Sequence, residues 1–174
     1  MKPLLLLDVD GVLNPTGRPT PDFRRYRCTV DGTAYTVHLN QRHGARLLEL
    51  ALAAGAELVW ATTWEHHAND WIAPRLGLPS LPVIAMGRDD RAVSRHGEMF
   101  KTRRVADYVG DRPFVWFDDQ VYQEDENYLR ARQGLGEFLL IHVPGEVGLT
   151  SRHLDVAREW LTLTGFSQGR SWEK

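Results

Sequence analysis

LLLDVDGVLN, residues 5–14, indicates the fold class more clearly than any other stretch of the chain. It belongs to a short apolar run over residues 4–9 that ends in acids, Asp8 and Asp10. An apolar run without alternation is typical of a strand buried on both faces of a parallel sheet. Asp8, Asp10 and Gly11 are then expected at the carboxyl end of this strand, where open α/β sheets bind their ligands.

The same pattern continues along the chain. Helical patterns alternate with further apolar runs, so we predict an α/β fold with a doubly wound, parallel, five-stranded, Rossmann-like sheet. The other four strands are expected at residues 57–61, 81–85, 113–117 and 138–143. The helices are expected from Asn40 to Gly55, over residues 64–76 with a bend or break near Pro74, over 101–109 and 124–133, and from Thr150 or Ser151 onward.

A β-hairpin flap interrupts this alternation after the first strand, at residues 22–39. Its arms, Arg24–Val30 and Thr33–Leu39, flank Asp31-Gly32, a strong signal for a two-residue turn. We expect the flap to add little to the core, and an ordinary surface loop is the alternative. The flap is expected to be an insertion in a single domain over residues 1–165, followed by a polar tail at 166–174.

Composition excludes several classes of protein. With 43% hydrophobic and 25% charged residues, the chain is neither disordered nor collagen-like. A net charge of −2 provides no global basic field for nucleic acid or membranes, although a local patch stays open. A lone cysteine, Cys28, excludes an intrachain disulfide and fits a reducing compartment. No apolar run reaches the ~18 residues of a membrane-spanning helix, so we expect a cytoplasmic protein without a membrane partner.

Polar side chains follow three of the predicted strands, and a lysine opens the helix before the fourth strand. They are Asp8 and Asp10, Thr62 and Thr63, Asp118 and Asp119, and Lys101. Four carboxylates at one sheet edge raise each other's pKa unless a cation neutralises them, and Mg²⁺ prefers oxygen ligands. A magnesium site beside a hydroxyl, an ammonium and a spare carboxylate is what phosphoryl transfer requires.

Four motifs of the haloacid dehalogenase (HAD) superfamily have counterparts here in the same order. LLLDVDGVLN at residues 5–14 resembles the first motif, and LVWATT at 58–63 resembles the second. Lys101 stands where the third motif has its lysine, and VWFDD at 115–119 is similar to the fourth. The resemblance covers residues 2–163 apart from the hairpin.

The resemblance implies a Mg²⁺-dependent phosphohydrolase that cleaves phosphomonoesters through an aspartyl-phosphate. Asp8 would be the nucleophile, and Asp10 the general acid and then the general base. Thr62 would bind the substrate phosphate, with Thr63 as the alternative, and Lys101 would neutralise Asp8 and the phosphate. The implied metal ligands are Asp8, the backbone carbonyl of Asp10, Asp118, and Asp119 directly or through water.

The expected substrate is a phosphorylated small molecule or a nucleic-acid end. Residues 15–39 and 64–100 leave no room for a large cap domain, and capless members of the superfamily often act on large substrates. The Thr62-Thr63-Trp64 sequence is similar to small HAD domains associated with nucleic-acid repair. The alternative is a catalytically weak HAD-fold module for binding or regulation; oligomeric state stays open.

Other residues have less specific interpretations. His66 and His67 are expected at the pocket rim or in solvent, because zinc-ligand spacing is absent. The arginines of the 88–95 loop are expected on a solvated surface, with a phosphate or RNA-backbone contact as the alternative. Of the chain's 21 basic residues only Lys2, Lys101 and Lys174 are lysines, which indicates that a compact ammonium is needed at position 101.

Overall fold

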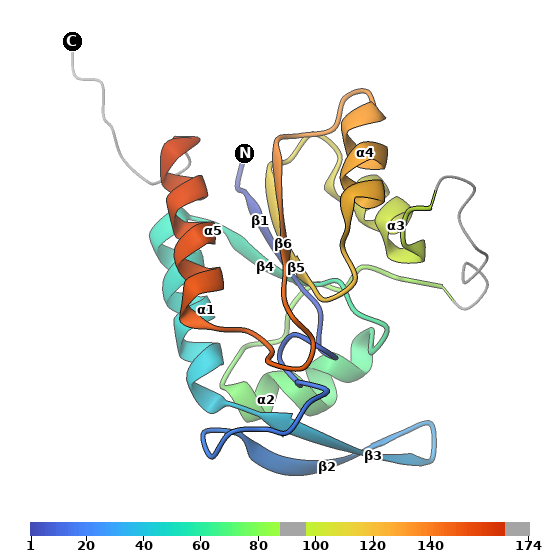
Figure 1. Ribbon diagram of the computed structural model, residues 1–174, viewed down its shortest axis with the longest axis vertical. Coiled ribbons are helices and arrows are strands. Elements are labelled where there is room, and N and C mark those ends of the chain that lie inside the picture. Colours follow the sequence, from blue (N-terminus) through green and yellow to red (C-terminus); the bar gives the residue numbers. More distant parts are fainter. Residues whose placement is uncertain (88–96, 166–174) are drawn as a thin grey trace.

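A parallel sheet of four strands forms the centre of the computed structural model, which describes residues 1–87 and 97–165. The spatial order is β4-β1-β5-β6 (Figure 1). The strands are β1 (Leu4–Leu7), β4 (Glu57–Trp60), β5 (Phe114–Asp118) and β6 (Phe138–His142). Leu7 pairs with both Trp60 and Phe117, so the residues that follow β1, β4 and β5 emerge at one edge.

Helices cover both faces of the sheet, which confirms the doubly wound α/β fold. In Figure 1, α1 (Gln41–Ala54) and α5 (Ser151–Leu163) lie on one side, and α3 (Phe100–Val109) and α4 (Gln123–Ala131) lie on the other. Helix α1 begins and ends where the sequence predicted. The Asn40 side chain accepts a hydrogen bond from the backbone N–H of Arg42, and Gly55 ends the helix with φ 60°.

Two apolar clusters, one on each face of the sheet, form the core. Successive side chains of a strand point to opposite faces, so β1 serves both clusters. Leu5 and Leu7 pack with residues of α1 and α5, whereas Leu4 and Leu6 pack with residues of α3 and α4. All four leucines are fully buried, which explains why this strand has no polar alternation.

The fifth predicted strand, residues 81–85, does not form. Only one isolated bridge, between Val83 and Trp60, joins this segment to β4. The Trp60 N–H donates to the Pro82 carbonyl and the Ile84 N–H donates to the Trp60 carbonyl, both at 2.9 Å. Pro82 has no N–H to continue the ladder along β4, so the pairing stops after one bridge.

The helix predicted at residues 64–76 is shorter and divided. A π-helical turn, η1 (Ala68–Ile72), leads directly into α2 (Ala73–Leu76). Pro74 lies in the first turn of α2, and it removes one N–H donor from a helical backbone that continues from η1. The sequence predicted a bend or break near Pro74; the backbone instead stays helical there, and only the helix type changes, from π to α, between Ile72 and Ala73.

The predicted hairpin is present as β2 (Arg24–Val30) and β3 (Thr33–Leu39), which lie below the carboxyl ends of the sheet strands in Figure 1. Asp31 and Gly32 both have positive φ, 49° and 79°, as a tight primed turn requires. The expectation that it adds little to the core is wrong. Every second side chain faces the body of the protein, and Cys28, Val37 and Leu39 are buried in the main cluster.

Two stretches lie outside the described residues: 88–96, which contains the whole 88–95 loop with its arginines, and the 166–174 tail. Among the helices of residues 1–87 and 97–165, none combines the length and apolar character that a membrane crossing needs.

Candidate active site

Lys101 joins the ends of the two central strands. Asp8 directly follows β1, and Asp118 is the last residue of the neighbouring β5. The Lys101 Nζ lies 2.5 Å from Asp8 Oδ2 and 2.6 Å from Asp118 Oδ2. All three side chains are buried, so this ion-paired cluster is shielded from the solvent that weakens surface salt bridges.

The charges of this cluster shift the pKa of its members. Burial lowers the pKa of Lys101, but the charges of Asp8 and Asp118 outweigh burial and the net shift is upward. Burial, together with the charge of Asp8, raises the pKa of Asp118 to about 7, although Lys101 opposes this shift. Burial and Asp8 also raise the pKa of Asp119. One ammonium therefore does not fully compensate the three carboxylates.

The same three carboxylates form a cluster that can hold a metal ion. Oxygen atoms of Asp8, Asp118 and Asp119 lie within 4.8 Å of one another. An all-carboxylate donor set suits a hard divalent cation such as Mg²⁺, which would supply the missing positive charge. The residues present therefore fit a magnesium ion.

Two glycines provide the space that Asp119 occupies. A Cβ atom at Gly11 would lie 2.4 Å from the Asp119 Cγ, and one at Gly145 would lie 2.9 Å from its Oδ2. Gly11 also has a φ of 76°, a conformation that side chains rarely adopt. Gly11 of the first motif thus leaves space for the Asp119 side chain of the fourth motif.

Asp10 has different surroundings from Asp8. It is exposed, and the Trp64 Nε1 donates to its Oδ2 at 2.8 Å while the Asn14 Nδ2 donates to its Oδ1 at 2.7 Å. The Asn14 Oδ1 in turn accepts a hydrogen bond from the backbone N–H of His38, in β3, at 2.8 Å. Asp10 is therefore fixed by the loop after β4 and, through Asn14, by the hairpin.

The two candidate threonines differ in exposure. Thr62 is fully buried, and its Oγ1 accepts a hydrogen bond from the backbone N–H of Trp64 at 3.4 Å. Thr63 is exposed and lines a cavity together with Asp10. Both hydroxyls follow β4 at the edge where Asp8 emerges, so the choice between them as phosphate ligand stays a prediction.

Sequence reasoning missed three residues that shape the site. The hydrogen bond from Trp64 to Asp10 and the contacts of Asn14 and Glu65 were not foreseen. Glu65 has a φ of 46°, and its Oε1 accepts hydrogen bonds from the backbone N–H groups of Met86 and Gly87. Asn14 lies in the first motif, but no spacing rule points to its hydrogen bonds.

The histidines after the second motif do not form a metal site. His66 is exposed, and His67 lies 3.6 Å from both Asp31 and Asp70. Throughout residues 1–87 and 97–165, the Asp8–Asp118–Asp119 group is the only set of three side chains positioned to share a metal ion.

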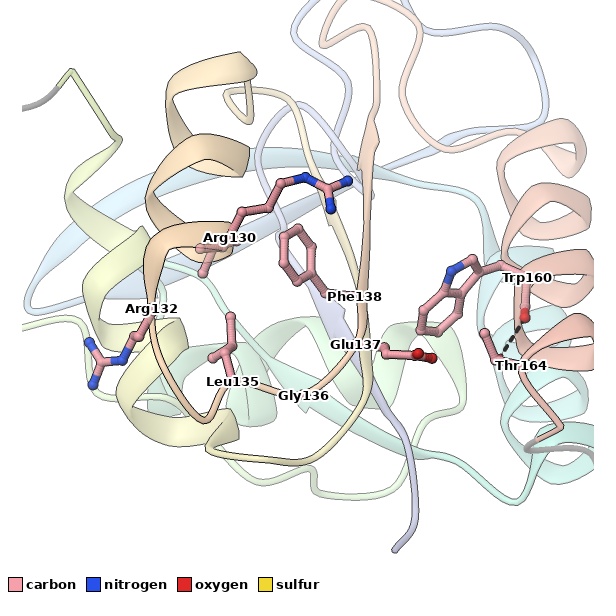
Figure 2. Close-up of a pocket in the computed structure, with 9 residues that line it drawn as sticks. Arg130, Arg132, Leu135, Gly136, Glu137, Phe138, Trp160 and Thr164 are labelled. Carbon is pink, nitrogen blue, oxygen red and sulfur yellow. Dashed lines mark hydrogen bonds between the residues drawn. The ribbon is translucent and has the colours of Figure 1, made fainter.

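A larger cavity, of about 510 Å³, lies at the opposite end of the sheet (Figure 2). It adjoins the start of β6, and the Arg130 guanidinium lies 5.5 Å from the Phe138 ring centre. Phe138 pairs with Phe114 at the beginning of β5, whereas Asp118 is at the end of that strand. This cavity is therefore separate from the acidic cluster.

Comparison with known proteins agrees with this geometry. Residues 4–154 match the model of a family described as the HAD domain in Swiss Army Knife RNA repair proteins. The chain belongs to this family. The match to HAD domains confirms the resemblance drawn from the four motifs, and family membership supports hydrolase-type activity for this HAD domain.

Among solved structures, one similar chain is a protein from Legionella pneumophila assigned to the HAD superfamily (subfamily III A) hydrolases. It is 18% identical to this HAD domain, with a TM-score of 0.44, and the match covers 95% of this chain and 89% of the other. A search of curated proteins found no match.

Proposed function

We propose that this HAD domain is a Mg²⁺-dependent phosphohydrolase that cleaves phosphomonoesters through an aspartyl-phosphate at Asp8. The observation that carries the proposal is the buried Lys101 ammonium bonded to both Asp8 and Asp118. A carboxylate held this way is fixed in position at a strand end, beside a cation that can also attract a phosphate. Asp10 stands apart from this cluster, where it can serve the leaving group.

The reaction proceeds in two displacements. A carboxylate oxygen of Asp8 attacks phosphorus, and the bond from phosphorus to the leaving oxygen breaks while Asp10 donates a proton to that oxygen. Water then attacks the phosphorus of the aspartyl-phosphate, and Asp10 takes a proton from that water. Inorganic phosphate leaves and the Asp8 carboxylate is restored.

The remaining polar side chains bind the substrate phosphate, neutralise its charge or hold the metal ion. Lys101 balances the charge of Asp8 and of the arriving phosphate, and the Thr62 hydroxyl donates to a phosphate oxygen, with Thr63 as the alternative. Asp8, Asp118, Asp119 and the backbone carbonyl of Asp10 would hold Mg²⁺. When bound, the ion neutralises phosphate oxygens as negative charge moves onto the leaving oxygen.

We propose the phosphorylated end of an RNA as the substrate, in preference to a phosphorylated small molecule. The family description names RNA repair proteins. The hairpin lines a hollow together with Asp10. Its Arg25 and Arg27 are exposed on the outer face of β2, and these two arginines supply basic side chains for a phosphodiester backbone. The buried free Cys28 supports a cytoplasmic setting.

A catalytically weak binding or regulatory module is the second candidate. The uncompensated charge among Asp8, Asp118 and Asp119 argues against it. A site without turnover gains nothing from burying like charges, because their repulsion and desolvation oppose folding.

The test is hydrolysis of 5′- and 3′-phosphorylated oligoribonucleotides with and without Mg²⁺, beside acetyl phosphate as a small substrate. We expect Mg²⁺-dependent release of phosphate from one RNA end by the wild type and none by Asp8→Asn. Tight RNA binding without turnover on any of these substrates would favour the binding module and refute the phosphohydrolase.

A further inference from the structure

A second hollow adjoins the candidate active site on the side of Asp10. Its volume is about 240 Å³, and it lies between the hairpin and the loop after β4. That volume is below the roughly 300–1,000 Å³ of pockets that enclose a whole drug-sized ligand, so it suits one ring system. Its lining includes Asp10, Tyr35, Thr36, Val37, Thr63 and Trp64.

Two aromatic rings give this hollow its character. The Tyr35 ring lies 5.9 Å from the Trp64 ring, centre to centre, at an angle of 60°. Tyr35 is 45% exposed, although Val37 on the same face of β3 is 1% exposed. Within residues 1–87 and 97–165, the exposed Tyr35 ring lies beside the buried Trp64 ring and stays partly open to solvent, so it offers an aromatic face to a ligand.

The position of Asp10 shows which part of a substrate this hollow would hold. Asp8 and Lys101 take the phosphate in the proposed reaction, and Asp10 protonates the leaving oxygen. Because Asp10 lines the hollow, the group attached to that oxygen extends into it. The hollow is thus a subsite for the leaving group, and its lining combines aromatic and apolar residues with Thr36 and Thr63.

We propose that this hollow binds the terminal nucleoside of the RNA substrate, with its base stacked on the Tyr35 ring. The proposal rests on the proposed phosphohydrolase function and names the part of the substrate that the chain recognises. Stacking needs only the π-face that every base has, so the subsite requires a base but does not select its identity. A repair enzyme that meets RNA ends of any sequence gains from such tolerance.

The experiment is a double-mutant cycle in which the Tyr35 ring is removed from the protein and the terminal base is removed from the substrate. The oligoribonucleotide is phosphorylated at whichever end the wild type hydrolyses, and a matched substrate lacks only the base of that terminal residue. The kcat/KM ratio of the base-bearing to the abasic substrate is measured for the wild type, Tyr35→Ala and Tyr35→Phe. Hydrolysis of acetyl phosphate, which has no ring, reports on the phosphoryl chemistry of each variant.

We expect the wild type to favour the base-bearing substrate by about 5- to 100-fold, the range of base–aromatic stacking. Tyr35→Ala should reduce this preference to below about twofold, and Tyr35→Phe, which keeps the ring, should restore it. Tyr108→Ala is the control, because Tyr108 is an exposed tyrosine on α3 and should leave the preference unchanged. Binding of both oligonucleotides to the Asp8→Asn variant should show the same dependence on Tyr35.

The outcomes separate the two proposals. If phosphate is released from RNA ends but the base-bearing and abasic substrates are hydrolysed equally, the base subsite is refuted and the phosphohydrolase stands. A preference for the base that Tyr35→Ala leaves intact also refutes this subsite. If neither RNA ends nor acetyl phosphate are hydrolysed in an Asp8-dependent manner, the proposed function fails and the subsite fails with it.

Discussion

Two aspartates that are two positions apart in the chain have opposite surroundings. Asp8 is buried and bonded to the Lys101 ammonium, whereas Asp10 is exposed and bonded to the neutral donors Trp64 and Asn14. Enzymes that use two carboxylates commonly divide their roles by such differences in environment. The buried, ion-paired carboxylate suits a nucleophile, and the exposed one can exchange protons with the leaving group and with water.

Because these two aspartates have different roles, replacing each with asparagine should lower turnover to a different extent. Asp8→Asn should abolish turnover, because the amide cannot attack phosphorus, while the chain stays folded. Asp10→Asn should slow turnover by roughly 10²–10⁴-fold, the usual contribution of general acid–base catalysis. Steady-state kinetics with the phosphorylated oligoribonucleotide measures both, and near-normal Mg²⁺-dependent activity of Asp8→Asn would exclude the aspartyl-phosphate.

Lys101 should tolerate no replacement. Lys101→Ala leaves Asp8 and Asp118 without their buried counter-charge and should lower kcat/KM by at least ~10²-fold, about 2.7 kcal/mol. Lys101→Arg should not restore activity, because a planar guanidinium does not fit the point between two carboxylates that lie 2.5 and 2.6 Å from the ammonium. Lys2→Ala, at an exposed position, is the control, and more than half of the wild-type rate in Lys101→Arg would contradict this placement.

The two threonines after β4 can be separated by substitution. If Thr62 binds the phosphate, Thr62→Ala should lower kcat/KM by roughly 10- to 100-fold, the effect of a hydrogen bond to a charged group. Thr62→Ser, which keeps the hydroxyl, should restore most of the activity, and Thr63→Ala should have a smaller effect. The reverse order in these measurements would assign the phosphate to Thr63.

Among the elements, the hairpin has two parts with different tasks. Near its base Leu39 is fully buried, and Cys28 and Val37 join the same core cluster. Its Tyr35 side and its turn at Asp31-Gly32 are exposed to solvent, and the His38 N–H fixes Asn14. The hairpin therefore connects the stability of the core to the position of Asp10.

A substitution at the base of the hairpin should lower stability. Leu39→Ala removes a fully buried side chain and should decrease the free energy of unfolding by about 2–5 kcal/mol. The matched control is Leu52→Ala on α1, where the leucine is 82% exposed and the expected change is below ~0.5 kcal/mol. Urea denaturation measures both, and equal effects would show that the hairpin is a flap without a share in the core.

Across the whole molecule, the acidic cluster couples stability to pH. The pKa of Asp118 rises from 3.8 to about 7 on folding because of burial and Asp8. Between these two values the folded protein keeps a proton that the unfolded chain releases, so the stability of the metal-free protein falls as the pH rises through this window. Mg²⁺ competes with the same proton for the carboxylate.

Stabilisation by Mg²⁺ should therefore increase with pH. We expect the rise in Tm on adding Mg²⁺ to be small near pH 5 and larger at about pH 8, above the pKa of Asp118. Asp118→Asn removes this titration and should remove most of the pH dependence. Thermal unfolding with and without Mg²⁺ measures the effect, and a shift in Tm that is independent of pH would contradict the assignment of Asp118 as a ligand.

The sequence by itself determined most of the elements and the members of the acidic cluster. Apolar runs, helix caps at Asn40 and Gly55, and the Asp31-Gly32 turn are local signals, because each depends on residues that are near in the chain. Asp8 and Asp118 were also predictable, because the carboxyl ends of parallel strands meet at one edge of a sheet. Lys101 was expected beside them from its place at the start of a helix and in the third motif.

Only the tertiary structure decided how distant segments meet. The pairing of residues 81–85 ends after one bridge because Pro82 lies where an N–H would have to face β4. The hydrogen bond from Trp64 to Asp10 joins positions 54 residues apart, and that from His38 to Asn14 joins positions 24 apart. Such contacts depend on where packing brings two backbones together, and neither periodicity nor motif spacing contains that information.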